Sequence, residues 1–132
     1  GLTDPVVGLS MGQTAEIIAH RFNIDRLTMD TFAVQSHQRL AAAQEAGFLD
    51  EIEALYNKNG HSFLNDDGVR TDSSIERLAK LRPVFDRQFG NVTAGNSAQI
   101  TDGAAMLLLA SEEAVKEFKL PVMGKIMDSQ WA

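Results

Sequence analysis

The residues of this 132-residue chain that have the chemistry for catalysis or binding are few, and cysteine is not among them. The segment Gly90-Asn-Val-Thr-Ala-Gly-Asn-Ser97 has nearly the spacing of a P-loop, in which backbone N–H groups cradle phosphates. Asn96 stands where a lysine would meet the terminal phosphates, so we do not assign a nucleoside triphosphate site to this segment. The run from Phe63 to Gly68 keeps only the later half of a calcium loop, because Phe63 replaces the first aspartate.

Two further side chains have suitable chemistry but no partners close by in the sequence. His37 lies on a predicted helix, and we interpret it as a partly exposed helix residue. Arg70 follows a turn and precedes a capped helix, where a guanidinium can stack on an aromatic base or pair with a phosphate. On residue type alone, a solvated surface charge is the commoner role of such an arginine.

Composition excludes several classes of protein. With no cysteine and three scattered histidines, the chain cannot form disulfides or Cys-ligated metal sites, offers no thiolate nucleophile, and gives little support for a His metal site. Twelve Lys and Arg against eighteen Asp and Glu give a net charge of −6, which argues against nucleic-acid binding. We expect no membrane span and a cytoplasmic location, because no apolar run approaches roughly 18 residues and no secretory signal is present. The start at Gly1 without methionine suggests a piece of a longer protein.

Two helices are predicted early in the chain. Ser10-Met-Gly-Gln13 has the form of a capping box and predicts a helix over about 11–22. Asp25 is a favourable N-cap for a longer helix over about 26–46, and Gly47 is placed to end it.

The side chains of the longer helix divide into two faces. We expect Phe32 and the other apolar residues at helical spacing to face the core and Asp30 to point elsewhere. A second capping box, Ser73-Ser-Ile-Glu76, predicts a short helix that buries Ile75, Leu78 and Ala79 and ends at Pro83.

Strands are predicted around and after these helices. Alternating acidic and apolar residues favour a half-exposed strand over 48–56. The apolar run 104–110 fits a strand covered on both faces or a buried helix, and its turn-like flanks favour the strand. Ser111 opens another helix, and 122–126 is predicted as a final strand. The sequence thus predicts a mostly helical first part followed by a strand-helix-strand segment.

Five stretches occur together in an order and spacing that resemble those of thiolases, the acyl-CoA acyltransferases that make or cleave 3-ketoacyl-CoA. They are Gly1-Leu-Thr-Asp4, Ser10-Met-Gly-Gln-Thr-Ala-Glu16, Asp30-Thr-Phe-Ala-Val-Gln-Ser36, Leu78-Ala-Lys-Leu-Arg-Pro83, and Val92-Thr-Ala-Gly-Asn96 with Thr101-Asp-Gly-Ala-Ala105. The resemblance implies an α/β fold (α+β as an isolated piece), with residues 1–90 as the loop domain that covers coenzyme A and 91–132 as a strand-helix-strand segment of the core.

The family's chemistry implies what this chain contributes. Thiolases pass through an acyl thioester on cysteine, and the nucleophile and the acid/base motifs lie outside the stretch that this chain resembles. With no cysteine, the isolated chain is expected to be inactive and to supply binding surface for coenzyme A as substrate, with no covalently bound cofactor. The resemblance also implies a parent enzyme that is a homodimer or homotetramer, and we expect the isolated piece to self-associate.

The resemblance assigns coenzyme A contacts to seven residues, namely Arg70, Met11, Ser10, Phe85, Ala94, Ala98 and Leu2. Arg70 corresponds to the arginine that flanks adenine, whereas Met11, Phe85 and Ala94 correspond to walls of the pantetheine tunnel. Three positions depart from the family pattern. Ser10 replaces a histidine of biosynthetic thiolases, Ala98 replaces a serine that bonds to pantetheine, and Arg77 replaces a small residue near the nucleotide.

An alternative interpretation from another class remains open. The amphipathic helix over about 26–46 and the absence of a catalytic set also fit a free-standing acidic module that binds a partner without chemistry.

Overall fold

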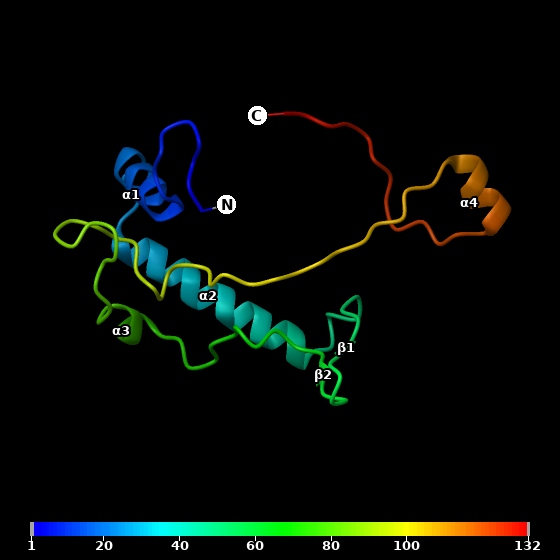
Figure 1. Cartoon of the computed structure of the whole chain (residues 1–132), viewed down its shortest axis with the longest axis horizontal. Coiled ribbons are helices and arrows are strands. Elements are labelled where there is room, and N and C mark those ends of the chain that lie inside the picture. The colour runs from blue at the N-terminus through cyan, green and yellow to red at the C-terminus, as the bar shows by residue number, and fades with distance from the viewer. Residues whose placement is uncertain (1, 132) are drawn as a thin grey trace. The chain divides into compact units, whose positions relative to one another are not determined.

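The computed structural model describes residues 2–131, and the chain forms two compact units, Gly1–Ile100 (unit 1) and Thr101–Ala132 (unit 2). Among the described residues, unit 1 carries three helices and one small antiparallel sheet, and unit 2 carries one short helix (Figure 1). The elements are α1 (Met11–Arg21), α2 (Arg26–Glu45), β1 (Leu55–Tyr56), β2 (Ser62–Phe63), α3 (Ile75–Leu78) and α4 (Glu112–Phe118).

Local capping chemistry fixes the ends of α1 and α2, as predicted. Ser10 and Gln13 form the complete capping box at the start of α1. Asp25 accepts a hydrogen bond from the backbone N–H of Thr28 at 2.8 Å, and its contacts with the Thr28 side chain and backbone lower the pKa of Asp25. Gly47 adopts a φ of 69° after the end of α2, a conformation that glycine tolerates best.

The faces of α2 differ from the prediction. Asp30 is 2% exposed and Val34 is also buried, whereas Phe32 is 71% exposed. The prediction that Asp30 points away from the core is therefore wrong. A buried carboxylate is stable only when its oxygens have partners, and Asp30 receives hydrogen bonds from Arg26 and Asn96.

The sheet is smaller than the sequence predicted. Only Leu55–Tyr56 of the predicted strand 48–56 is a strand, and it pairs antiparallel with Ser62–Phe63 across the turn at Gly60. Both strands are exposed on both faces. The apolar side chains of the alternating pattern are therefore not covered by another layer of the fold.

Helix α3 packs against α2 and is shorter than predicted. Ser74, not Ser73, is its N-cap, and the helix ends at Leu78, with Ala79 as its C-cap, before Pro83 is reached. Leu78 is buried as predicted, Ile75 is half-buried, and Ala79 is exposed.

The chain that follows α3 returns beside α1 and α2, where acidic side chains hold it (Figure 1). Both oxygens of Glu16 on α1 accept the backbone N–H of Asn91, at 3.1 and 2.9 Å, and Oε1 also accepts the N–H of Val92 at 2.9 Å. Val92 and Thr93 are buried at this point, at 4% and 0% exposure. The segment 91–97 is therefore fixed mainly through its backbone polar groups.

In unit 2, α4 begins after Ser111 as predicted, but the two flanking strands are not formed. Residues 104–110 and 122–126 have no strand assignment, and Met106 and Leu107 are 96% and 87% exposed. A strand exists through hydrogen bonds to a neighbouring strand, and within residues 2–131 no segment pairs with these two.

The first prediction concerns Glu16. Replacing it with alanine in Glu16→Ala leaves the N–H groups of Asn91 and Val92 without their acceptor, so we expect the free energy of unfolding to fall by about 2 kcal/mol. Chemical denaturation measures this loss. Glu45→Ala, at the exposed end of α2, serves as the control and should change stability by less than about 0.5 kcal/mol. Equal stability of the two variants would contradict the prediction.

The second prediction concerns the apolar run 104–110. Its exposed side chains should drive self-association of the 132-residue chain, because contiguous apolar surface of this kind is covered in stable proteins. Light scattering should detect oligomers that Leu107→Lys with Leu109→Lys reduces in size, whereas Gln130→Lys leaves them unchanged. A monomeric wild-type chain would refute this expectation.

Candidate functional site

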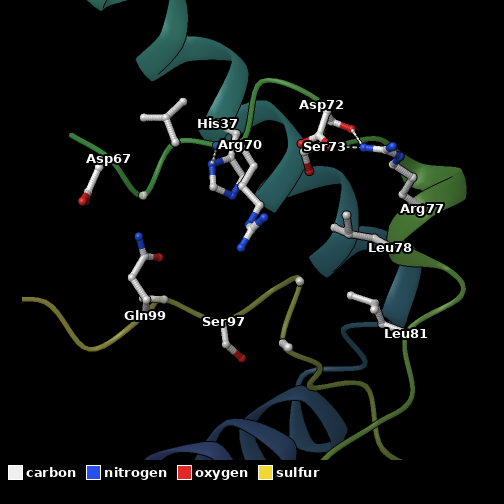
Figure 2. A pocket seen from close by; sticks show the side chains of 15 residues that line it. His37, Asp67, Arg70, Asp72, Ser73, Arg77, Leu78, Leu81, Ser97 and Gln99 are labelled. Carbon is white, nitrogen blue, oxygen red and sulfur yellow. Dashed lines mark hydrogen bonds and ion pairs between the residues drawn. The ribbon is translucent and has the colours of Figure 1, made fainter. Parts of the chain in front are cut away.

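A cavity of about 770 Å³ lies in unit 1 between α2, α3 and the segment 94–99 (Figure 2). Its lining combines charged, small and apolar side chains: His37, Asp67, Gly68, Val69, Arg70, Asp72, Ser73, Arg77, Leu78, Leu81, Ala94, Gly95, Ser97, Ala98 and Gln99. A second cavity of about 280 Å³ shares several of these residues and extends along α2 past Phe32 and Leu40. The volume of the larger cavity is within the range of small-molecule sites.

His37 joins the two cavities and supports Arg70. Its Nδ1 accepts the backbone N–H of Arg70 at 3.2 Å, so a residue of α2 fixes the main chain that carries the guanidinium (Figure 2). Because Nδ1 is an acceptor in this contact, a proton on the neutral ring resides on Nε2. The sequence predicted the partial exposure of His37 but not this contact, since the two residues are 33 positions apart.

The charges of the cavity are partly compensated. Arg77 pairs with Asp72 through Nη1 and also donates to the Asp72 carbonyl oxygen at 3.0 Å (Figure 2). Arg70 is exposed and forms no salt bridge with any of the residues that the structure describes. The cavity therefore presents one guanidinium that is available for an anion or an aromatic ring.

A second cluster of predicted residues lies at the start of α1. The backbone N–H of Met11 donates to the Leu2 carbonyl oxygen at 2.9 Å, and both side chains are exposed. Phe85 places its ring directly against Gly12, where a Cβ would clash with it. The hydroxyl of Ser10 is engaged with Gln13 in the capping box.

The loop that carries Phe85 has its own polar anchor. The backbone N–H groups of Phe89 and Gln88 donate to Asp86 at 3.0 and 2.9 Å and lower the pKa of Asp86. The backbone N–H of Val84 donates to the Val92 carbonyl oxygen at 3.0 Å, which closes the loop.

The structure thus divides the seven predicted residues between two places. Arg70, Ala94 and Ala98 line the large cavity, and Leu2, Ser10, Met11 and Phe85 lie around the start of α1. Sequence reasoning missed Gln99 as a lining residue, since it has no distinctive spacing, and it noted Ser97 only as the end of the P-loop-like segment.

A family model described as the N-terminal domain of thiolase matches residues 1–113. The chain belongs to the thiolase family. The prediction made from the five sequence stretches is confirmed.

Curated relatives and solved structures agree with this assignment. The chain is 43% identical to an acetyl-CoA acetyltransferase of a Synechocystis species, over 100% of this chain and 34% of the relative. It is 44% identical to a 3-ketoacyl-CoA thiolase of Vibrio cholerae, over 95% of this chain and 29% of the relative. The chain therefore spans about a third of the length of these relatives.

Among solved structures, human mitochondrial 3-ketoacyl-CoA thiolase in complex with CoA is similar, with a TM-score of 0.83 and 40% identity over 89% of this chain and 30% of that one. The dimeric peroxisomal thiolase of Saccharomyces cerevisiae gives a TM-score of 0.83 and 37% identity over the same shares. The predicted thiolase-like fold is confirmed, and the chain is mostly helical with a small two-stranded sheet. The two strands predicted on either side of α4 are not formed.

Within residues 2–131, no group of three or more His, Cys, Asp or Glu is arranged to hold a metal ion. None of the helices in this described part of the chain combines the length and the apolar character that a bilayer crossing requires.

The third prediction concerns Gly95 in the cavity wall. A Cβ at this position would lie 2.6 Å from Leu81 Cδ1 and 2.9 Å from Leu78 Cγ, so Gly95→Ala must displace the facing wall. We expect thermal unfolding to report a loss of about 1–3 kcal/mol, the usual cost of overpacking. Gly103→Ala has open space around it and is the control. An unchanged Gly95→Ala variant would show that the wall at Leu78 is not closely packed.

Proposed function

We propose that the protein containing this chain is an active thiolase, which exchanges acyl-CoA and acetyl-CoA with 3-ketoacyl-CoA and CoA, and that these residues cover the CoA. The observation that carries the proposal is the cavity beside Arg70 in a chain that resembles a thiolase solved with CoA. Within this proposal residues 1–90 act as the CoA-covering loop domain, and residues 91–132 belong to the catalytic core.

The cavity has side chains suited to binding the nucleotide end of CoA. The guanidinium of Arg70 can stack on adenine, which contributes about 0.5–1 kcal/mol at an exposed site and more when water is excluded. Ala94 and Ala98 provide small walls past which a narrow pantetheine chain can run. The net charge of −6 gives no general attraction for an anionic ligand, so affinity must come from these local contacts.

The cluster at the start of α1 suits the other end of the ligand. Met11, Phe85 and Leu2 are apolar and partly exposed, which fits walls around pantetheine and a short acyl group. The hydroxyl of Ser10 is committed to the helix cap, so Ser10 contributes mainly through its position beside Met11.

The reaction itself needs groups that this chain does not contain. In thiolysis a cysteine thiolate attacks the 3-keto carbon, the C2–C3 bond breaks, and its electron pair leaves with acetyl-CoA and takes up a proton. The thiolate of a second CoA then attacks the acyl-cysteine and releases the acyl-CoA. Because these 132 residues include no cysteine, the nucleophilic thiolate of the enzyme must come from other polypeptide, and the chain alone is inactive in this proposal.

The assembly of the parent enzyme is part of the same proposal. One similar structure is described as a dimeric thiolase, which supports a homodimer or a homotetramer built from homodimers.

The fourth prediction tests Arg70 in the full-length protein. Arg70→Ala removes the stacking group, so we expect the KM for CoA to rise about tenfold while kcat at saturating CoA changes less than twofold. Steady-state thiolysis with CoA as the varied substrate measures both constants. Arg21→Ala, at the exposed end of α1, is the matched control and should leave the KM unchanged. An unaltered KM in Arg70→Ala would remove Arg70 from the CoA site.

A further inference from the structure

Asp30 is a buried charge whose two oxygens are both engaged. It lies on α2 at 2% exposure, and its Oδ2 accepts from Arg26 Nε at 2.7 Å. Its Oδ1 accepts from Asn96 Nδ2 at 2.9 Å. Neither Asp30 nor Arg26 is among the residues that line the two described cavities, so neither is placed to touch a ligand there.

Arg26 connects this carboxylate to the α3 side of the cavity. Its guanidinium donates through Nη2 to the Leu78 carbonyl oxygen and through Nη1 to the Leu81 carbonyl oxygen at 3.2 Å. Leu78 and Leu81 both line the cavity. The fork of the guanidinium therefore fixes the backbone at the end of α3 to the first turns of α2.

Asn96 connects the same carboxylate to the opposite wall. Its Oδ1 accepts the backbone N–H of Thr93 at 2.7 Å, and its Nδ2 also donates to the Asn91 carbonyl oxygen at 2.8 Å. Thr93 is completely buried, so these bonds have little competition from water. The segment that presents Ala94 to the cavity is thereby held in one conformation.

We propose that Asp30 is a positioning residue for the CoA site, because through Arg26 and Asn96 it sets the separation of the Leu78–Leu81 wall and the Ala94–Ala98 wall. The two walls meet where Gly95 lies against Leu78 and Leu81, and the polar bridge joins them through Asp30, so the bridge controls how far they open. A ligand held between them loses contact on one side when the bridge breaks, and small misplacements of binding groups cost affinity steeply. This inference rests on the proposed function, since it takes CoA as the occupant of the cavity.

The experiment compares Asp30→Asn with wild type in the full-length protein. Asn keeps the volume and an acceptor for Asn96, but its NH2 group faces the Nε–H of Arg26, so the bridge to α3 breaks. We expect the KM for CoA to rise about tenfold, with kcat at saturating CoA within about twofold of wild type. A loss of kcat at unchanged KM would overturn the proposal.

A second variant keeps the test decisive if Asp30→Asn does not fold. Arg26→Lys retains a cation beside Asp30 but cannot reach two carbonyl oxygens with a rigid fork, so we expect the same rise in KM for CoA. Ser111→Ala removes the N-cap of α4 in unit 2 and serves as a control that destabilises the protein without touching the cavity walls. If Ser111→Ala raises the KM as much as Arg26→Lys does, the effect is general destabilisation and the proposal fails.

Calorimetric titration with CoA separates this inference from the function on which it rests. Wild-type protein that binds no CoA would contradict the proposed function itself. Wild type that binds CoA, together with an Asp30→Asn or Arg26→Lys variant that binds it equally well, would overturn the positioning role alone. A selective loss of affinity in the variants supports both.

Discussion

A carboxylate that is wholly or partly removed from water must find donors close by, and two such carboxylates organise unit 1. Asp30 on α2 is buried and binds Arg26 and Asn96, and Glu16 on α1 is half-buried and binds the backbone of Asn91 and Val92. Among the described residues, just four apolar side chains are buried, so dispersion and apolar burial cannot alone specify how the segment 91–97 meets the helices. Charge-assisted hydrogen bonds are directional and therefore do so.

The same polar anchoring explains how small residues can form a fixed wall of the cavity that we propose as the CoA site. Ala94 and Ala98 have no side-chain chemistry of their own, and their usefulness depends on a backbone that does not move. Arg70 depends in a similar way on His37, which holds its main chain from another element. Family membership and the resemblance to a CoA-bound thiolase support the proposal that this cavity binds CoA, which the cavity alone would not do.

Unit 2 differs from unit 1 because its structure is limited by apolar side chains that no other described element covers, not by buried charges. Its run 104–110 carries apolar side chains that stay exposed, because a strand covered on both faces needs neighbouring strands and covering helices. Only α4 forms there, since a helix satisfies its backbone hydrogen bonds within one segment and Ser111 caps it locally. The chain spans about a third of its relatives, and a buried strand is the kind of element that depends most on the other parts of a fold.

The sequence by itself determined the features that depend on neighbours along the chain. The capping residues Ser10 and Asp25 and the stop at Gly47 placed the first two helices, and the five ordered stretches identified the family. Tertiary structure decided which side of α2 is buried, because the partners of Asp30 include Asn96, 66 residues away. It also decided which predicted site residues share a cavity. A contact across such distances leaves no local periodicity, so only the folded chain reveals it.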